Sequence, residues 1–256
     1  MSRQIHDLIS NIGKVSHREE IERSGLDPHL ALLRVWQAER LAHTYADLLD
    51  QPRYRAACLF FLEDIYAARD FSQRDHDLET MYEFMRRFVP DAVSRPAALT
   101  IKLHRMTEAL DRKLLDVLMN QIGVTDSITV EQYAEGYRRC DNYRERVEQI
   151  DAIIEICEHI DAIVRNPVTG PALSLAKRPL RGAGYGEVVT FLERGYDSFK
   201  RMHGSRHFRK TLQEREMGIL DRFYANDPDP FRFEMSLEPT PEETSTSDSA
   251  DRVPNS

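Results

Sequence analysis

The chain has 256 residues, of which 41% are hydrophobic and 30% are charged, and its formal net charge is −8. A chain of this size can bury one substantial core or two small ones. No stretch approaches the ~20 consecutive apolar residues that span a bilayer. The pI near 5.6 disfavours a broad nucleic-acid-binding face, because phosphate contacts need clustered Lys and Arg. These features predict a protein that binds neither a membrane nor nucleic acid.

Three cysteines, Cys58, Cys140 and Cys157, show no metal-ligand spacing. The first residues lack the apolar region of a secretory signal. An odd number of cysteines without an export signal is typical of reduced thiols, so we expect a cytoplasmic protein.

The first predicted helices lie between residues 16 and 65. Ser16 and Glu19 form a capping-box pattern, and Gly25 follows as a stop signal. Asp27 and Pro28 then predict the start of a second helix, which runs to about residue 50, before Pro52 imposes a break. Apolar residues at spacings of three and four predict a third helix over residues 54–65.

Three further helices are predicted in the middle of the chain. One starts at Ser72, where Ser72 and Asp75 form a box-like cap, and it ends before a loop bracketed by Pro90 and Pro96. The next covers residues 99–123. Thr129 opens another capping box and predicts the longest helix, over residues 129–165. The wide apolar face of that helix indicates a central position in a helical bundle.

The remainder of the chain divides into a connector, a last helical region and a tail. Residues 166–186 are rich in Pro and Gly and locally basic, which predicts a connector. A helical region follows over residues 187–225, with an interruption at residues 203–205. Residues 236–256 carry five acidic residues against Arg252, which gives a net charge of −4. They also include almost no bulky residues, and this composition favours an acidic disordered tail.

The predicted architecture is therefore all-α. It consists of a flexible or partly helical N-terminus at residues 1–15, a single bundle of roughly seven helices over residues 16–235, and the tail at 236–256. No alternating run of β-branched and aromatic residues indicates a strand.

A corner between two helices, at residues 60–79, concentrates charged side chains. Such a cluster could bind a cation or hold a carboxylate with a raised pKa for acid–base chemistry. It could equally be structural, because Asp75 and Asp77 fall in the first turn of a helix, where the dipole favours anions. The structural explanation needs fewer assumptions. The candidate residues at this corner are Asp64, Tyr66, Asp70, Arg74, Asp75 and Asp77.

The run from Phe60 to Glu79, FFLEDIYAARDFSQRDHDLE, resembles the signature FFLxDLYGxxDFxxRDxDL of an all-helical, proteobacterial family without a known activity. Ala67 departs from the glycine of that signature, which implies a less sharp turn. FLERGYDSFKRM at 191–202 and DPDPF at 227–231 resemble the C-terminal part of the same family. The resemblance spans roughly residues 30–231 and implies a helical fold, but no mechanism.

Metal sites are disfavoured by the spacing of possible ligands. A di-iron bundle needs Glu-x-x-His motifs, and none occurs. His203 and His207 are four residues apart, but the glutamate of the zinc-protease motif is missing and Gly204 breaks the helix. We therefore expect no metal and no cofactor.

Two other charged sets have alternative interpretations. Arg178 and Arg181 precede a Gly-rich loop at a helix start, so they could bind an anion, although no strand precedes the loop as in nucleotide-binding folds.

Arg144 and Asp161 fall on the apolar stripe of the longest helix. They could line an internal pocket, or they could mark where the stripe drifts out of the core.

The missing catalytic and metal motifs favour a non-catalytic module that interacts with another protein or with itself. The alternative is an enzyme or carrier that binds a small molecule in a pocket inside the bundle, near the corner at residues 60–79.

Overall fold

Aspartate, proline and threonine start several helices as the sequence predicts. The computed structural model describes residues 21–85 and 91–232. The Asp27 side chain accepts hydrogen bonds from the backbone N–H groups of His29 and Leu30, and Pro28 occupies the first turn. Thr129 and Gln132 form the predicted reciprocal capping box. The predicted cap at Ser16 and the N-terminus and tail at residues 1–15 and 236–256 lie outside the described residues.

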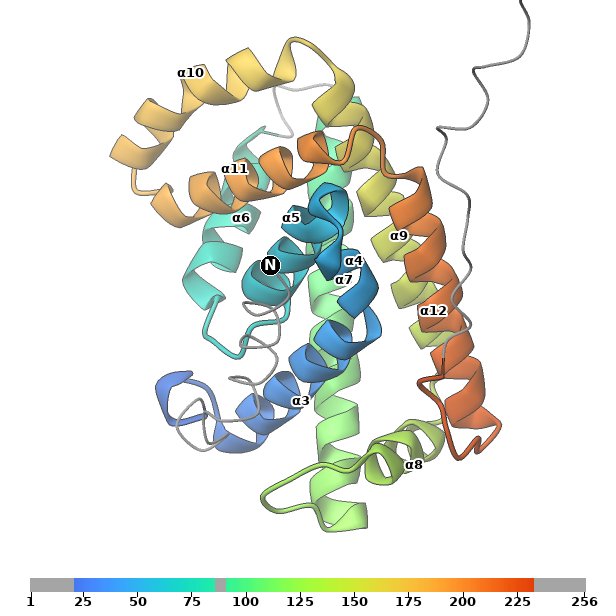
Figure 1. Cartoon of the computed structure of the whole chain (residues 1–256). Helices are drawn as coiled ribbons and strands as arrows, with labels where there is room; N and C mark the ends of the chain where they lie inside the picture. The colour runs from blue at the N-terminus through green and yellow to red at the C-terminus, as the bar shows by residue number, and fades with distance from the viewer. Residues whose placement is uncertain (1–20, 86–90, 233–256) are drawn as a thin grey trace, which may run out of the picture.

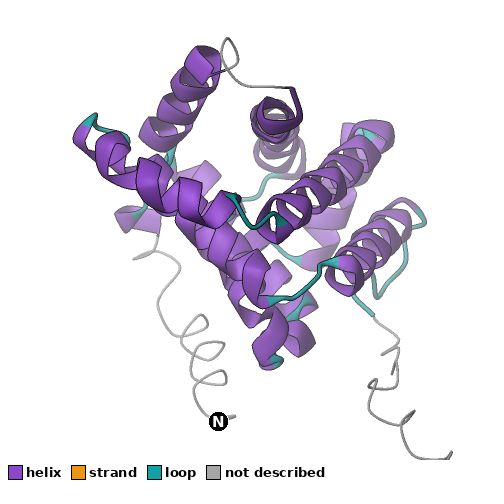
Figure 2. Cartoon of the chain, turned by 90° about the horizontal axis from the view of Figure 1, so that it is seen from above, coloured by secondary structure: helices purple, strands orange, loops and turns teal. Residues whose placement is uncertain are grey.

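The described residues form ten α-helices and two π-helical segments and contain no strand (Figure 2). The elements are α3 (Pro28–Thr44), α4 (Ala46–Asp50), α5 (Pro52–Phe60), η1 (Phe61–Ile65), α6 (Ser72–Met85), α7 (Asp91–Asp116), η2 (Val117–Ile122), α8 (Val130–Cys140), α9 (Tyr143–Arg165), α10 (Thr169–Gly182), α11 (Gly186–Arg201) and α12 (Arg206–Tyr224). The all-α prediction is confirmed, but the prediction of roughly seven helices is too low.

Two predicted helices are each split in two. The helix expected over residues 28–50 breaks at Tyr45, between α3 and α4. The helix expected over residues 129–165 breaks at Asp141, which has a left-handed backbone conformation with φ 48°. Apolar periodicity continued through both breaks, so the sequence pattern did not reveal them.

Two predicted loops differ from the structure as well. The segment predicted as a connector at residues 166–186 forms α10 over Thr169–Gly182, even though Pro179 lies inside this helix. Helix α7 begins at Asp91, before the predicted loop boundary at Pro96. By contrast, the interruption predicted at residues 203–205 is present, because His203 and Gly204 both have positive φ between α11 and α12.

Helix α9 packs against α7, α11 and α12 and lies beside α12 in Figure 1. Helix α8 closes one end of the bundle, while α10 lies across the opposite end over α11. Helices α7 and α8 approach closely at Gly136, where a Cβ atom would lie 2.8 Å from Cδ1 of Leu114. Gly136 therefore sets the spacing between these two helices.

The buried apolar side chains form two clusters. The first is centred on α7, α8 and the C-terminal half of α12, and includes Leu114, Leu118, Tyr133 and Phe223. The second is centred on α5 and the junction of α11 with α12 and includes Phe199, Met202 and Phe208. A cavity lies where the two clusters meet, and polar side chains such as Arg40 and Glu216 form part of its wall.

Candidate functional site

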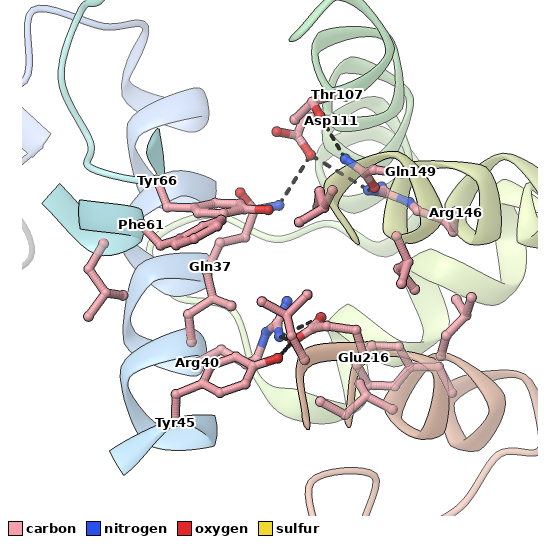
Figure 3. A pocket seen from close by; sticks show the side chains of 18 of the residues that line it. Gln37, Arg40, Tyr45, Phe61, Tyr66, Thr107, Asp111, Arg146, Gln149 and Glu216 are labelled. Atoms are coloured by element: carbon pink, nitrogen blue, oxygen red, sulfur yellow. Dashed lines mark hydrogen bonds and ion pairs between the residues drawn. The ribbon is translucent and has the colours of Figure 1, made fainter. Parts of the chain in front are cut away.

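A cavity with a volume of about 90 Å³ lies in the interior of the bundle, between the two apolar clusters (Figure 3). Side chains from α3, α5, η1, α7, α8, α9 and α12 line it, so nearly every long helix contributes to its wall. Its apolar wall comes from both clusters and includes Leu41, Leu62, Ile150, Ile153, Phe208, Leu212, Ile219, Leu220 and Phe223.

One polar side of the cavity is an ion pair between α3 and α12. Arg40 donates from Nη1 to both carboxylate oxygens of Glu216, at 2.6 and 2.8 Å, and Tyr45 donates its hydroxyl to Glu216 Oε1 at 2.8 Å. Burial alone would lower the pKa of Arg40, but Glu216 raises it above its ordinary value. Burial raises the pKa of Tyr45. Arg40 and Tyr45 therefore keep their protons and hold the Glu216 carboxylate between them.

The other polar side joins α3, α7 and α9. Gln37 Nε2 donates to Asp111 Oδ1 at 3.2 Å, and Gln149 Nε2 donates to Thr107 at 2.8 Å. Arg146 Nη1 donates to Gln149 Oε1 at 3.0 Å, but it lies 3.9 Å from Asp111 Oδ1, beyond hydrogen-bonding distance. In Figure 3 this group and the Arg40–Glu216 pair lie on opposite sides of the cavity.

Three buried polar atoms of the cavity wall have no hydrogen-bond partner among the described residues. They are Gln37 Oε1, Arg40 Nε and Arg146 Nε. Buried polar groups are normally paired with protein groups or with ordered water. All three atoms are themselves fully buried, so they belong to polar side chains packed within a wall whose surface is mainly apolar.

The wall nearest the corner is a π-helical segment. The π-helix η1 holds Phe61 and Leu62, and Tyr66 follows its last residue; all three line the cavity. Burial raises the pKa of Tyr66.

The candidate corner divides into a cavity-facing part and a structural part. Of the six candidate residues only Tyr66 lines the cavity. Asp64 is buried beneath Arg194, whose Nε lies 3.0 Å from Asp64 Oδ2, and Arg74 donates to the backbone carbonyl of Asp64. Burial raises the pKa of Asp64, although Arg194 and Arg69 act in the opposite direction.

Arg74 connects the corner to its neighbours. It donates from Nε and Nη2 to Asp75 Oδ1, at 2.8 and 2.7 Å, and its guanidinium lies 4.0 Å from the ring centre of Phe71 and 4.6 Å from that of Phe191. These contacts attach the start of α6 to α11.

The cap of α6 differs from the expected arrangement. The side chain of Asp70 accepts from the backbone N–H of Ser72 at 2.8 Å, whereas the sequence suggested Ser72 and Asp75 as the cap. Asp77 accepts from Gln73 at 2.8 Å. Asp70, Asp75 and Asp77 thus have local partners, which agrees with the structural explanation of the charge cluster. Whether the corner also binds a ligand stays a prediction.

The other charged candidates lie away from the cavity. Arg178 and Arg181 are on α10, and Arg181 Nη2 is paired with Glu193 at 2.8 Å. Arg144 is exposed, as expected for a drifting stripe, whereas Asp161 is buried and paired with Arg165. Within the described ranges, no group of three or more His, Cys, Asp or Glu side chains is placed to hold a metal ion.

Sequence reasoning missed most of the polar cavity wall. Gln37, Arg40, Asp111, Arg146 and Glu216 were not candidates, although all five line the cavity. A signal was available for Gln37, because it lies four residues after Leu33 and four before Leu41, on the apolar face of its helix. Polar residues in such positions are buried and need partners.

Residues 16–230 match the model of a protein family described as a domain of unknown function (DUF8198). The match covers most of the chain, so the chain belongs to this family. This agrees with the resemblance to a family of unknown function, while the bacterial origin and the signature motif stay predictions. The chain matches no curated protein and no solved structure. None of the described helices is both long and apolar enough to cross a membrane.

Proposed function

We propose that this member of the DUF8198 family binds a small organic molecule in the cavity between its two apolar clusters. The proposal takes up the alternative that the sequence left open, a ligand-binding bundle with a pocket near residues 60–79. The proposed role is that of a binding protein or carrier.

The observation that supports this role is the chemistry of the cavity wall. Pockets for small molecules are mainly apolar with a few convergent polar groups, and this wall has that composition. Arg40 and Glu216 lie on one side of the cavity, and Asp111 and Arg146 lie on the other.

The test is native mass spectrometry of the full chain purified without added ligand, on the wild type and two variants. Ile153 lines the cavity, whereas its neighbour Ile154 on α9 does not, and both are partly buried. The variant Ile153→Phe places a larger side chain in the cavity, and Ile154→Phe is the matched control. We expect a bound mass on the wild type and on Ile154→Phe that is lost from Ile153→Phe and released on denaturation.

A wild-type mass equal to that of the bare chain would count against the proposal. So would a bound mass that both phenylalanine variants retain, because the molecule would then lie elsewhere.

A second candidate function is self-association through α10, in keeping with the predicted interaction module. No residue of α10 is buried, and Val168, which precedes the helix, and Leu175, seven residues later, are 68% and 82% exposed. Exposed apolar side chains that gather into one patch mark contact surfaces. We expect sedimentation equilibrium to show a dimer that Leu175→Glu dissociates. A wild-type monomer over the whole concentration range would contradict this second candidate.

A further inference from the structure

The charges on the cavity wall balance each other. Among the described residues, four charged side chains line the cavity: Arg40 pairs with Glu216 at 2.6 Å, and Arg146 lies 3.9 Å from Asp111. Asp111 also lies 4.0 Å from Arg34, which is not part of the wall. A charged ligand would have to separate one of these pairs or remain in the interior without a counterion. Both alternatives are unfavourable, because the interior solvates charge poorly. The wall therefore favours an uncharged ligand.

One polar group of the wall differs from the others in having no partner within the protein. Four tyrosines line the cavity. The hydroxyl of Tyr45 donates to Glu216, and those of Tyr133 and Tyr137 lie 3.2 Å apart in a mutual hydrogen bond. The hydroxyl of Tyr66 has no hydrogen-bond partner among the described residues. It is not one of the fully buried unpaired atoms either, so a neighbouring molecule can reach it.

The Tyr66 hydroxyl is directed inward and remains protonated. In Figure 3 the hydroxyl end of this side chain points away from η1 and toward the interior of the bundle. Burial raises the pKa of Tyr66, and the carboxylates of Glu216 and Asp111 raise it further, whereas Arg40 acts in the opposite direction. Glu216 and Asp111 lie on opposite sides of the cavity, so the hydroxyl is influenced from both. At neutral pH the group is therefore a hydrogen-bond donor.

We propose that the ligand of this cavity is an uncharged, mainly hydrocarbon molecule that carries a hydrogen-bond acceptor, such as an ether or carbonyl oxygen, for the Tyr66 hydroxyl. This inference rests on the proposed function, since it assumes that the cavity holds a ligand. Leu62, Ile150 and Ile219 on the wall supply the contacts for the hydrocarbon part. The Tyr66 hydroxyl gives the ligand its orientation.

The volume of the cavity limits the size of this molecule. A water molecule needs roughly 10–15 Å³ of such volume, so about 90 Å³ corresponds to a molecule of roughly six to nine non-hydrogen atoms. A single substituted ring or a short branched chain fits this range. Nucleotides and other large cofactors do not.

The test compares matched probes by isothermal titration calorimetry on the full chain at pH 7. Ethylbenzene and anisole have nearly the same shape, but only anisole carries an ether oxygen. Benzoate and protonated benzylamine are of similar size and carry a negative and a positive charge. We expect both neutral probes to bind, and each charged probe to bind at least about tenfold more weakly than anisole, because the balanced wall offers no free counterion.

Three variants locate the probe and its oxygen. Tyr66→Phe keeps the ring and removes the hydroxyl, so it should weaken anisole by about threefold to tenfold, the contribution of one hydrogen bond, and leave ethylbenzene nearly unchanged. Ile153→Phe should abolish the binding of both neutral probes, whereas Ile154→Phe should retain it. If Tyr66→Phe fails to fold by circular dichroism, the carbon-13 signal of Tyr66 Cζ in the wild type gives the readout, and anisole should shift it more than ethylbenzene.

The outcomes separate this inference from the proposed function. A charged probe that binds as tightly as anisole, or a Tyr66→Phe variant that treats anisole and ethylbenzene alike, overturns the inference, while cavity binding stands if Ile153→Phe abolishes it. Binding that survives in Ile153→Phe lies outside the cavity and also overturns the inference. So does the absence of binding for every probe, and the mass spectra of the wild type and Ile153→Phe then decide separately whether the cavity holds a ligand.

Discussion

Removal of Glu216 should destabilise the protein far more than removal of the whole ion pair. In Glu216→Met, the Arg40 guanidinium loses the two hydrogen bonds of 2.6 and 2.8 Å, and the Tyr45 hydroxyl loses its acceptor. The Arg40 and Glu216 side chains are 13% and 16% exposed, so water compensates little. Removing one partner of a buried pair costs about 3–5 kcal/mol, and we expect a loss in this range.

The double variant Arg40→Met with Glu216→Met provides the control. It removes both charges of the pair, and methionine occupies a volume similar to that of either side chain, so we expect a stability within about 2 kcal/mol of the wild type. Urea denaturation of the full chain, followed by circular dichroism, measures each free energy of unfolding. A loss below about 1 kcal/mol for Glu216→Met, or a double variant as unstable as the single one, would refute the reasoning.

Two further predictions concern packing and pH. Gly136→Ala should lower the free energy of unfolding by about 1–2 kcal/mol, because the added Cβ lies 2.8 Å from Leu114 Cδ1. Gly182→Ala is the control, because its added Cβ meets open space and should not destabilise the protein. Thermal denaturation of both variants measures the difference. Burial raises the pKa of Cys58 and Cys157 to about 12. The contribution of these protonated thiols to the free energy of unfolding is therefore fully present below pH ~9 and is lost as the pH rises toward 12. Urea denaturation at pH 8 and pH 10 should show this fall, and replacing both cysteines with alanine should reduce it; an unchanged fall would assign it to other groups.

Local signals in the sequence were sufficient for much of the secondary structure. Asp27 and Thr129 cap helices as predicted, because a cap depends only on residues three positions away. Positive φ at Gly204 ends α11 near the predicted interruption for a similarly local reason. The split at Asp141 and the helix α10 were missed, because they depend on what the neighbouring helices offer in three dimensions.

The sequence by itself determined the all-helical fold of the described residues and where several of their helices begin, such as α3 after Asp27 and α8 after Thr129. The tertiary structure alone decided where a ligand could bind, because Arg40 meets Glu216 across 176 residues, and Gln37 meets Asp111 across 74. The sequence shows that a polar residue lies on an apolar helix face, but it does not show which distant residue pairs with it, because the packing of the helices decides that. The burial of Arg146 and the sharing of Asp111 are therefore properties of the packing.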